Sequence, residues 1–371
     1  MRIGVSARGW SVAVGGARKI LEEALRRLPV LGAGHEILSY QPPGSPVVPG
    51  TTPVWVAAPH PAWWERVALP RALRADPPDV LFAPKTLLPP NLPAGVRTLS
   101  LVLDLLYFPI GGSYLHEYRW RDIAYNRLFY RNSCRRATAL ACISEHTRRD
   151  LQAVCPDLPP GKIHVVPLGV DPPAAEAVSA ARRTEVRARH GLARPYVFYA
   201  GSLSPRKNMV RGVRAFARLA PEFPHDLVVT AGKSWRDRDV EAEVDRCGLR
   251  ARFRRLGAVS AEDLPALYAG ADAFFFPSLY EGFGLPVLEA MACGCPVVAA
   301  NASAIPEAAG GAAELADPLD EAALAAALRR VLADPARAAD LRAAGRKRAA
   351  ECSWDRTVRG WLDLMENRVQ P

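Results

Sequence analysis

The strongest restriction on the fold is an alternation of short apolar strands with amphipathic helices. In the first half, the strand-like runs are residues 2–7, Glu36–Tyr40, Val54–Ala57, Val80–Ala83, Thr98–Leu103 and Ala139–Ile143. Helical patterns lie between some of them, at Ala17–Leu28, Ala62–Ala75 and roughly Glu117–Cys134, and a further helix is expected to begin at Ser144. Strands interleaved with helices form parallel sheets that helices cover on both faces. In such sheets the loops at the carboxyl ends of the strands form the ligand site.

A second series of the same kind follows an abrupt change in composition at residues 168–173. Its strand-like runs are Tyr196–Ala200, Leu227–Ala231, Phe253–Leu256, Ala273–Phe276 and Val297–Ala300. A chain of 371 residues suits two domains. We therefore predict an α/β protein with two Rossmann-like domains, residues 1–170 and 171–352, whose parallel sheets face a central cleft. A last helix is expected within residues 353–371.

The composition is that of an ordinary globular enzyme, with 49% hydrophobic and 23% charged residues. The first residues, MRIGVSARGW, lack the apolar core of a signal peptide, and no apolar run reaches the length of a membrane span. The seven cysteines are scattered and form no CxxC pair, which favours reduced thiols and a cytoplasmic protein. Arginine in an alanine- and proline-rich chain supplies most of the net charge of +10. This charge alone does not indicate nucleic acid, and no nucleic-acid partner is predicted.

The stretch Phe274–Ala300, FFFPSLYEGFGLPVLEAMACGCPVVAA, is the first candidate site. It reads as an apolar strand, a glycine-rich turn, a helix beginning near Leu285, and a second strand. A helix N-terminus behind a glycine-rich loop attracts phosphate through its free amides and the helix dipole. Glu281 stands at the start of the turn and Glu289 lies in the helix, where a carboxylate can accept both hydroxyls of a ribose. The pattern predicts a site for a nucleoside diphosphate; the alternative is an ordinary strand-turn-helix with two solvated glutamates.

A second candidate is the segment 201–208, GSLSPRKN, which follows the first strand of the second half. Arg206 offers a forked set of donors and Lys207 a compact charge, so together they can hold a diphosphate. The alternative is a pair of solvated surface cations. By contrast, Asp237 and Asp239 form a D-x-D pattern in a context that favours the acidic first turn of a helix over a metal site, and no metal is predicted.

Both candidate segments belong to patterns found together in a known family. The run 281–298 resembles the E-x7-E signature of retaining glycosyltransferases of the GT-B class, family 4, and 201–208 resembles the G-x-x-x-x-R/K-K-N segment of these enzymes. The resemblance implies transfer of a sugar from a UDP- or GDP-linked donor to a hydroxyl of a glycan, a lipid-linked acceptor or a small molecule. It also implies retention of the anomeric configuration, with no metal and no cofactor.

The resemblance assigns a role to individual residues. Arg206, Lys207 and the amides of the glycine-rich turn would hold the donor diphosphate, Glu281 would bind sugar hydroxyls, and Glu289 would bind the ribose. The full set of donor-binding residues that it implies is Gly15, Gly16, Gly201, Gly232, Lys233, Leu256, Val259, Gly282, Phe283, Gly284, Leu285 and Glu289. It further implies that the last helix, which begins near Trp354, crosses back to the first domain.

Leu103-Asp104 is a departure from the family pattern, because many relatives have His-Asp at this place and the histidine faces the donor sugar. Either the sugar contact differs or the activity is specialised or weakened. Asp104 remains a candidate catalytic residue, and its alternative is a cap at the end of a strand.

Between Tyr118 and Arg136, six arginines alternate with aromatic residues. This pattern fits either peripheral contact with anionic lipid at the inner membrane face or a helix that packs aromatics inward and points arginines to solvent. Two further alternatives for the whole chain are a GT-B epimerase or phosphorylase, and a non-catalytic basic binding module.

Overall fold

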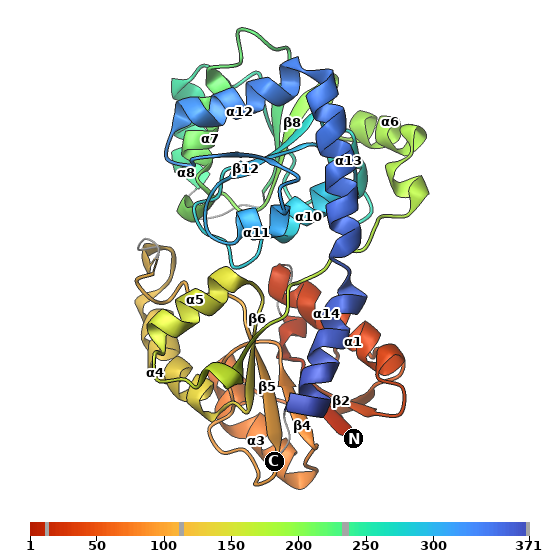
Figure 1. Ribbon diagram of the computed structural model, residues 1–371, viewed down its shortest axis with the longest axis vertical. Helices are drawn as coiled ribbons and strands as arrows, with labels where there is room; N and C mark the ends of the chain where they lie inside the picture. The colour runs from red at the N-terminus through yellow and green to blue at the C-terminus, as the bar shows by residue number, and fades with distance from the viewer. Residues whose placement is uncertain (12–14, 111–114, 232–236, 369–371) are drawn as a thin grey trace. The chain divides into compact units, whose positions relative to one another are not determined.

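The computed structural model describes residues 1–11, 15–110, 115–231 and 237–368. The chain divides into two compact units, one made of residues 1–168 and 354–371 and the other of residues 169–353 (Figure 1). These bounds lie within two residues of the domain boundaries expected from the sequence; the acceptor and donor roles of the two domains stay predictions.

The first unit contains a seven-stranded parallel sheet in the order β3-β2-β1-β4-β5-β6-β7. Its strands are β1 (Arg2–Ser6), β2 (Glu36–Gln41), β3 (Thr52–Trp55), β4 (Val80–Ala83), β5 (Arg97–Val102), β6 (Ala139–Cys142) and β7 (Ile163–Val165). Its helices are α1 (Gly16–Leu31), α2 (Pro61–Trp63), α3 (Leu69–Ala75), α4 (Trp120–Arg136), α5 (Glu145–Val154) and α14 (Trp354–Asp363). β1 pairs with β2 on one side and β4 on the other, so the strand order reverses there.

The ends of several of these helices follow from local chemistry. Ser144 precedes α5, and its hydroxyl accepts a hydrogen bond from the amide of Thr147, as expected for an N-cap. The predicted helix 62–75 instead consists of α2, a π-helical turn at Trp64–Ala68, and α3. Pro70 at the start of α3 lacks an amide hydrogen, which accounts for a change in the hydrogen-bond pattern at this point.

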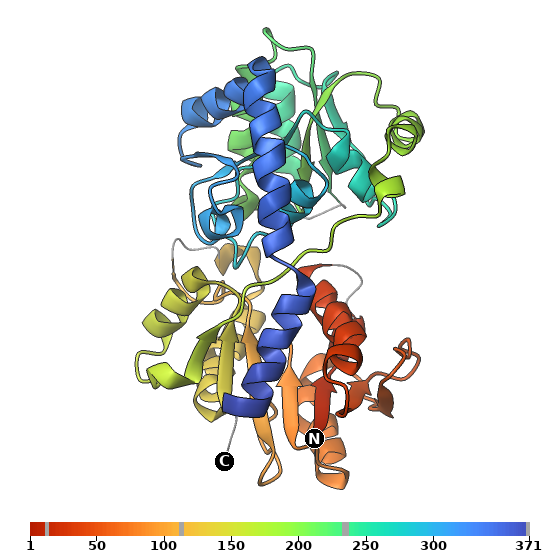
Figure 2. The ribbon, with the colours of Figure 1, turned by 45° about the vertical axis from the view of Figure 1, so that its right-hand side comes forward.

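Helix α14 completes the first unit from the far end of the sequence. Trp361 is fully buried, and its ring lies 5.2 Å from that of Phe82 in β4. Thr357 donates a hydrogen bond to the carbonyl of Pro167, and Arg27 of α1 forms an ion pair with Asp355. Figures 1 and 2 both place α14 beside α1. The expectation that the last helix returns to the first domain agrees with this packing.

The second unit contains a six-stranded parallel sheet in the order β10-β9-β8-β11-β12-β13. Its strands are β8 (Tyr196–Ala200), β9 (Asp226–Thr230), β10 (Phe253–Arg255), β11 (Ala273–Phe276), β12 (Val297–Ala300) and β13 (Glu314–Ala316). Its helices are α6 (Ala180–Arg189), α7 (Met209–Ala217), α8 (Asp237–Arg246), α9 (Leu264–Ala269), α10 (Leu285–Ala292), α11 (Ile305–Ala309), α12 (Glu321–Ala333) and α13 (Pro335–Glu351). Phe274, Phe275 and Phe276 of β11 are fully buried, as expected of a central strand covered on both faces.

The prediction of an α/β protein with two parallel sheets is therefore confirmed. The described residues contain no helix long and apolar enough to cross a membrane.

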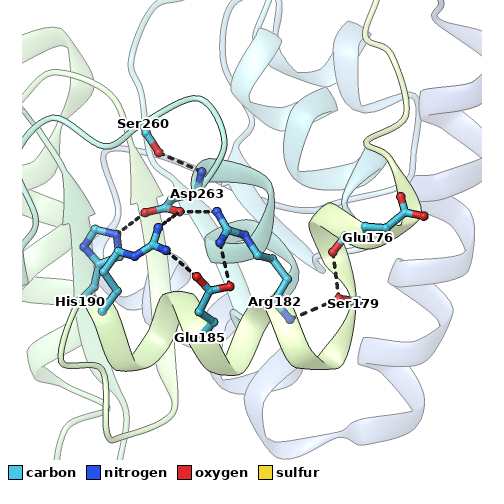
Figure 3. Close-up of polar contacts among 8 residues, drawn as sticks. Glu176, Ser179, Arg182, Glu185, His190, Ser260 and Asp263 are labelled. Carbon is cyan, nitrogen blue, oxygen red and sulfur yellow. Dashed lines mark hydrogen bonds and ion pairs between the residues drawn. The ribbon is translucent and has the colours of Figure 1, made fainter.

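Helix α6 is held to α9 by a carboxylate with several partners (Figure 3). Asp263 is buried, and its side chain lies 2.7 Å from Arg182, 2.6 Å from Arg189 and 3.1 Å from His190. Its backbone amide donates to the hydroxyl of Ser260. Burial alone would raise the pKa of Asp263, but the hydrogen bonds from Arg189 and His190 outweigh it and hold the pKa below its usual value.

We expect Asp263→Asn to lower the free energy of unfolding by about 2 kcal/mol at pH 7, because charge-assisted hydrogen bonds to a buried group are lost. A carboxyl whose pKa is lower in the folded state stabilises the fold above its unfolded pKa of about 4, and this contribution is lost as the pH falls through the folded value. Urea denaturation should therefore show a difference between variant and wild type that is full at pH 7 and shrinks below about pH 4. The exposed Asp340→Asn on α13 is the matched control; an equal difference at pH 3 and pH 7 would contradict the assignment.

Candidate active site

Two loops meet at the carboxyl ends of β8 and β11, the neighbouring strands at which the order of the second sheet reverses. Residues 201–208 follow β8 and residues 277–284 follow β11. The amide of Leu279 donates to the carbonyl of Arg206 over 2.8 Å, which fixes one loop to the other. Ligands of open parallel sheets bind at such a reversal point.

Glu281 lies between two cations from the other loop. One carboxylate oxygen, Oε1, is 2.5 Å from Nζ of Lys207, and the other, Oε2, is 3.3 Å from Nη1 of Arg206. The same Nη1 donates to the carbonyl of Tyr280 over 3.1 Å. Two positive groups and one negative group leave this cluster with a net positive charge, which suits an anionic ligand.

The charges in this cluster are shielded from water. The exposed fraction of Lys207 is 7%, and its ammonium group lies 5.1 Å from the ring centre of Phe276. Burial alone would raise the pKa of Glu281, but the charges of Lys207 and Arg206 outweigh it and hold the pKa below its usual value. Glu281 is therefore a carboxylate at neutral pH, able to accept hydrogen bonds from hydroxyl groups.

Asn208 ties the loop of the two cations to the segments that follow β11 and β13. Its backbone is left-handed, with φ of 60°, and it joins the 3₁₀ turn Pro205–Lys207 to α7. Its buried side-chain Nδ2 donates to the carbonyls of Pro277 (3.1 Å) and Pro318 (2.7 Å). Asparagine adopts this conformation more readily than most residues with a side chain. The sequence analysis gave Asn208 no role, although an Asn next to paired cations was the available signal.

Helix α10 begins behind the glycine-rich turn, as expected. Gly284 precedes it with φ of 115°, a conformation that a residue with a side chain rarely adopts, and Pro286 lies in its first turn. Among the described residues, no side chain caps this helix end by accepting a hydrogen bond. The amide of Leu285 at its first position can therefore bind an anion, whereas Pro286 has no amide hydrogen and the amide of Val287 donates to the carbonyl of Gly284. Phe283 is buried, whereas Gly282 and Leu285 are half-buried.

Both glutamates of the E-x7-E pattern are held by neighbours that the sequence analysis did not identify. The backbone amide of Glu281 donates to the hydroxyl of Ser303, whose own φ is 52°. Oε2 of Glu289 accepts a hydrogen bond from the hydroxyl of Tyr268 over 3.1 Å. Burial raises the pKa of Tyr268 well above its usual value, so this hydroxyl remains a donor.

The remaining predicted residues of the second unit lie in different places. Gly201, with φ of 146°, directly follows β8, and an added Cβ would come within 3.0 Å of the hydroxyl of Tyr199. Leu256 and Val259 follow β10, at the outer edge of the sheet, and are half-buried. Gly232 and Lys233 lie outside the described residues.

The predicted residues of the first unit lie in two places, one at the start of α1 and one after β5. Gly15 (φ of 134°) precedes α1, and Gly16 is its first residue; both are exposed. Asp104 follows β5, and its Oδ1 accepts a hydrogen bond from the amide of Leu106 over 3.3 Å, so it does form a cap after a strand. Leu103 beside it is half-buried.

Helix α4 only partly fits the hypothesis of inward aromatics. Tyr130 is buried, and Phe129 lies under the guanidinium of Arg66 at 4.1 Å. Trp120 and Leu128, in contrast, are 74% and 69% exposed. The prediction of inward packing is therefore wrong for Trp120, because this residue begins the helix and extends beyond the core.

The D-x-D pattern begins α8, so the expected acidic helical turn is confirmed. Asp237 forms an ion pair with Arg255.

Comparisons with known proteins identify the family to which the chain belongs. Residues 182–348 match the family "Glycosyl transferases group 1", and residues 14–173 match "Glycosyltransferase Family 4". A GDP-mannose-dependent alpha-(1-6)-phosphatidylinositol monomannoside mannosyltransferase of Mycolicibacterium smegmatis is 30% identical over 267 residues, which are 68% of this chain and 67% of that relative. The chain belongs to the group 1 glycosyltransferase family.

Another relative in this glycosyltransferase family matches over a shorter region. The O-antigen chain mannosyltransferase B of Escherichia coli is 40% identical over 163 residues, 43% of this chain and 42% of the relative. The chain thus spans about half the length of several curated relatives that it matches.

Solved structures establish the fold class. Sucrose-phosphate synthase from Thermosynechococcus elongatus matches with a TM-score of 0.78 and 20% identity over 98% of each chain. The HepE protein of Anabaena, solved in complex with UDP-glucose, matches with a TM-score of 0.74 and 18% identity over 98% of this chain and 99% of that one. The predicted GT-B fold is confirmed.

We expect Asn208→Gly to lower the free energy of unfolding by about 2 kcal/mol, because two buried carbonyls lose their donor. Asn208→Ala should lower the free energy of unfolding by about 1 kcal/mol more, because the Cβ of alanine is strained in the left-handed backbone that glycine adopts freely. Urea denaturation of the two variants measures the difference. Asn301→Ala, at an exposed loop position, is the control; equal stability of the glycine and alanine variants would contradict the role of the backbone.

Proposed function

We propose that this protein is a retaining glycosyltransferase that moves a hexosyl group from a nucleotide diphospho-sugar to an acceptor hydroxyl. The observation that supports the proposal most is the cluster of Arg206, Lys207 and Glu281 beside the uncapped start of α10. This arrangement offers two cations and the amide of Leu285 to a diphosphate, and a carboxylate to the sugar that the diphosphate bears.

In the proposed reaction, Arg206, Lys207 and the amide of Leu285 at the start of α10 stabilise the negative charge that develops on the departing diphosphate. Glu281 accepts hydrogen bonds from sugar hydroxyls and orients the ring. Retention would follow from attack on the face that the phosphate leaves, with a phosphate oxygen taking the proton of the acceptor. Because these protein groups supply the positive charge, the reaction needs no divalent metal.

The donor that we propose to test first is GDP-mannose. The relatives from M. smegmatis and E. coli are named as mannosyltransferases, and the former as GDP-mannose-dependent. UDP-glucose is the comparison donor, because it is bound in the similar HepE structure. The names of these two relatives include the O-antigen chain and phosphatidylinositol monomannoside. These names favour a glycan or lipid-linked acceptor.

Contact with a lipid surface is part of the proposal. Trp120 and Leu128 are exposed on α4, a helix with six arginines in or directly before it. An exposed tryptophan among cations is suited to the interface of an anionic membrane.

Replacing either cation of the cluster should weaken donor binding. We expect Lys207→Met and Arg206→Met each to lower the affinity for GDP or UDP about tenfold or more, since a hydrogen bond between charged groups contributes about 1.5–3 kcal/mol. Turnover should fall by at least the same factor, and EDTA should have no effect on the wild type. Calorimetry and a product assay measure these quantities.

Arg218→Met, at an exposed position of the same unit, is the matched control. Turnover that survives in the double variant of Arg206 and Lys207, or that is lost on chelation, would contradict the proposal. Incubation of the donor without an acceptor separates the alternatives, because an epimerase would form a new nucleotide sugar.

Glu289 should be the residue that recognises the ribose. We expect 2′-deoxy-GDP to bind the wild type several-fold more weakly than GDP, and this preference to disappear in Glu289→Gln. Tyr268→Phe should weaken GDP binding in the wild type and add little in the Glu289→Gln variant, because the two residues act as one unit. Calorimetric titration of the wild type, the two single variants and the double variant gives the coupling free energy between Tyr268 and Glu289. Additive effects of the two substitutions would contradict the proposed ribose site.

A further inference from the structure

The second unit contains a cavity of about 300 Å³ at the amino ends of the strands, opposite the candidate active site. Its walls include residues 269–272, which lead into β11, and Cys293 and Gly294, which follow α10. The candidate active site lies at the carboxyl ends of the strands, whereas this cavity lies near the amino ends of β11 and β12. The two sites are therefore separate.

Three arginines supply the positive charges of the lining. Arg183 comes from α6, and Arg342 and Arg346 come from successive turns of α13. Asp272 is the acidic residue of the lining, and its Oδ2 lies 3.2 Å from Nε2 of His225. Three guanidinium groups and one carboxylate give the walls an excess of two positive charges.

Arg342 and Arg346 lack the partners that other arginines of the unit have, and Arg183 is only partly hydrogen-bonded. Neither Arg342 nor Arg346 forms an ion pair or hydrogen bond with any residue that the structure describes. Nε of Arg183 is buried without a hydrogen-bond partner, and its Nη1 is 3.4 Å from the carbonyl of Ala269. Grouped guanidinium groups repel each other, and a buried donor without a partner costs free energy. An anion in the cavity would remove both costs.

The walls of the cavity are fixed by close packing. The guanidinium of Arg346 lies directly over Gly294, where φ is 71°; a Cβ there would come within 2.8 Å of it. At Gly345, α13 approaches α10 so closely that a Cβ would lie 3.1 Å from Met291. The Asp263 cluster of Figure 3 holds α6, the helix that contains Arg183.

We propose that this cavity binds the phosphate group of a small molecule, either inorganic phosphate or a phosphate monoester such as a sugar phosphate. Planar guanidinium groups pair with phosphate oxygens through two parallel hydrogen bonds. The excess of two charges matches a dianion, and the volume is at the lower end of the range for small-molecule sites. The alternative is that the arginines only compensate the partial negative charge at the C-termini of α9 and α10.

Isothermal titration of the full chain with inorganic phosphate, glucose 6-phosphate and sulfate, at constant ionic strength, tests the proposal. We expect saturable binding that is weakened about tenfold or more in Arg342→Met and in Arg346→Met. Both side chains are at least partly exposed, so the variants should fold. Lys347→Met removes a neighbouring cation of α13 outside the cavity and should bind as the wild type does. Arg206→Met changes the separate donor loop and should also bind normally.

The pH dependence provides a second measurement. A phosphate monoester gains its second charge near pH 6, so the affinity for glucose 6-phosphate should rise between about pH 5.5 and 7.5. Sulfate is a dianion throughout, and its affinity should stay flat. Tighter binding of glucose 6-phosphate than of inorganic phosphate would assign a monoester, and equal affinity would assign free phosphate. Absence of saturable binding, unchanged affinity in both arginine variants, or loss of binding in Arg206→Met would overturn the proposal.

Discussion

The second unit depends on the parallel pairing of β8 with β11. The chain leaves β8 toward one side of the sheet and β11 toward the other. Two loops that are far apart in sequence therefore meet at the carboxyl ends of these strands. Lys207 and Glu281 are 74 residues apart, yet their charged groups are in contact. Aromatic rings of the two strands pack against each other across this pairing, Phe198 with Phe274 at 6.2 Å and Tyr199 with Phe276 at 6.1 Å between ring centres. The charges in the site are thus held in place by the hydrophobic core beneath them.

Periodicity was sufficient to predict most of the central strands, because fully buried strands such as β8 and β11 appear as short apolar runs between turn residues. The edge strands β7 and β13 were not predicted. Each has three residues, and their half-buried positions give too short a pattern. The split of the helix at 62–75 was also missed, since Pro70 is compatible with a helix start as well as with an interruption.

Residues of the candidate site could be found where type and spacing restrict the chemistry, as at Glu281 and Glu289. Their partners could not be found in this way. Tyr268 and Ser303 support the two glutamates from other elements, and nothing in their immediate sequence indicates which side chain they contact. The pairing of Glu281 with two cations was equally hidden, because pairing across loops depends on the order of strands in the sheet.

The position of α14 affects the order in which the units can form during synthesis. The second unit is a continuous segment and can complete its core once residue 353 has left the ribosome. The first unit has most of its residues earlier but lacks Trp361, which fills the space against Phe82. Domains generally fold as units, from the N-terminal end first. Here the packing of Trp361 against Phe82 cannot form in the N-terminal half of the chain until the last helix has been synthesised.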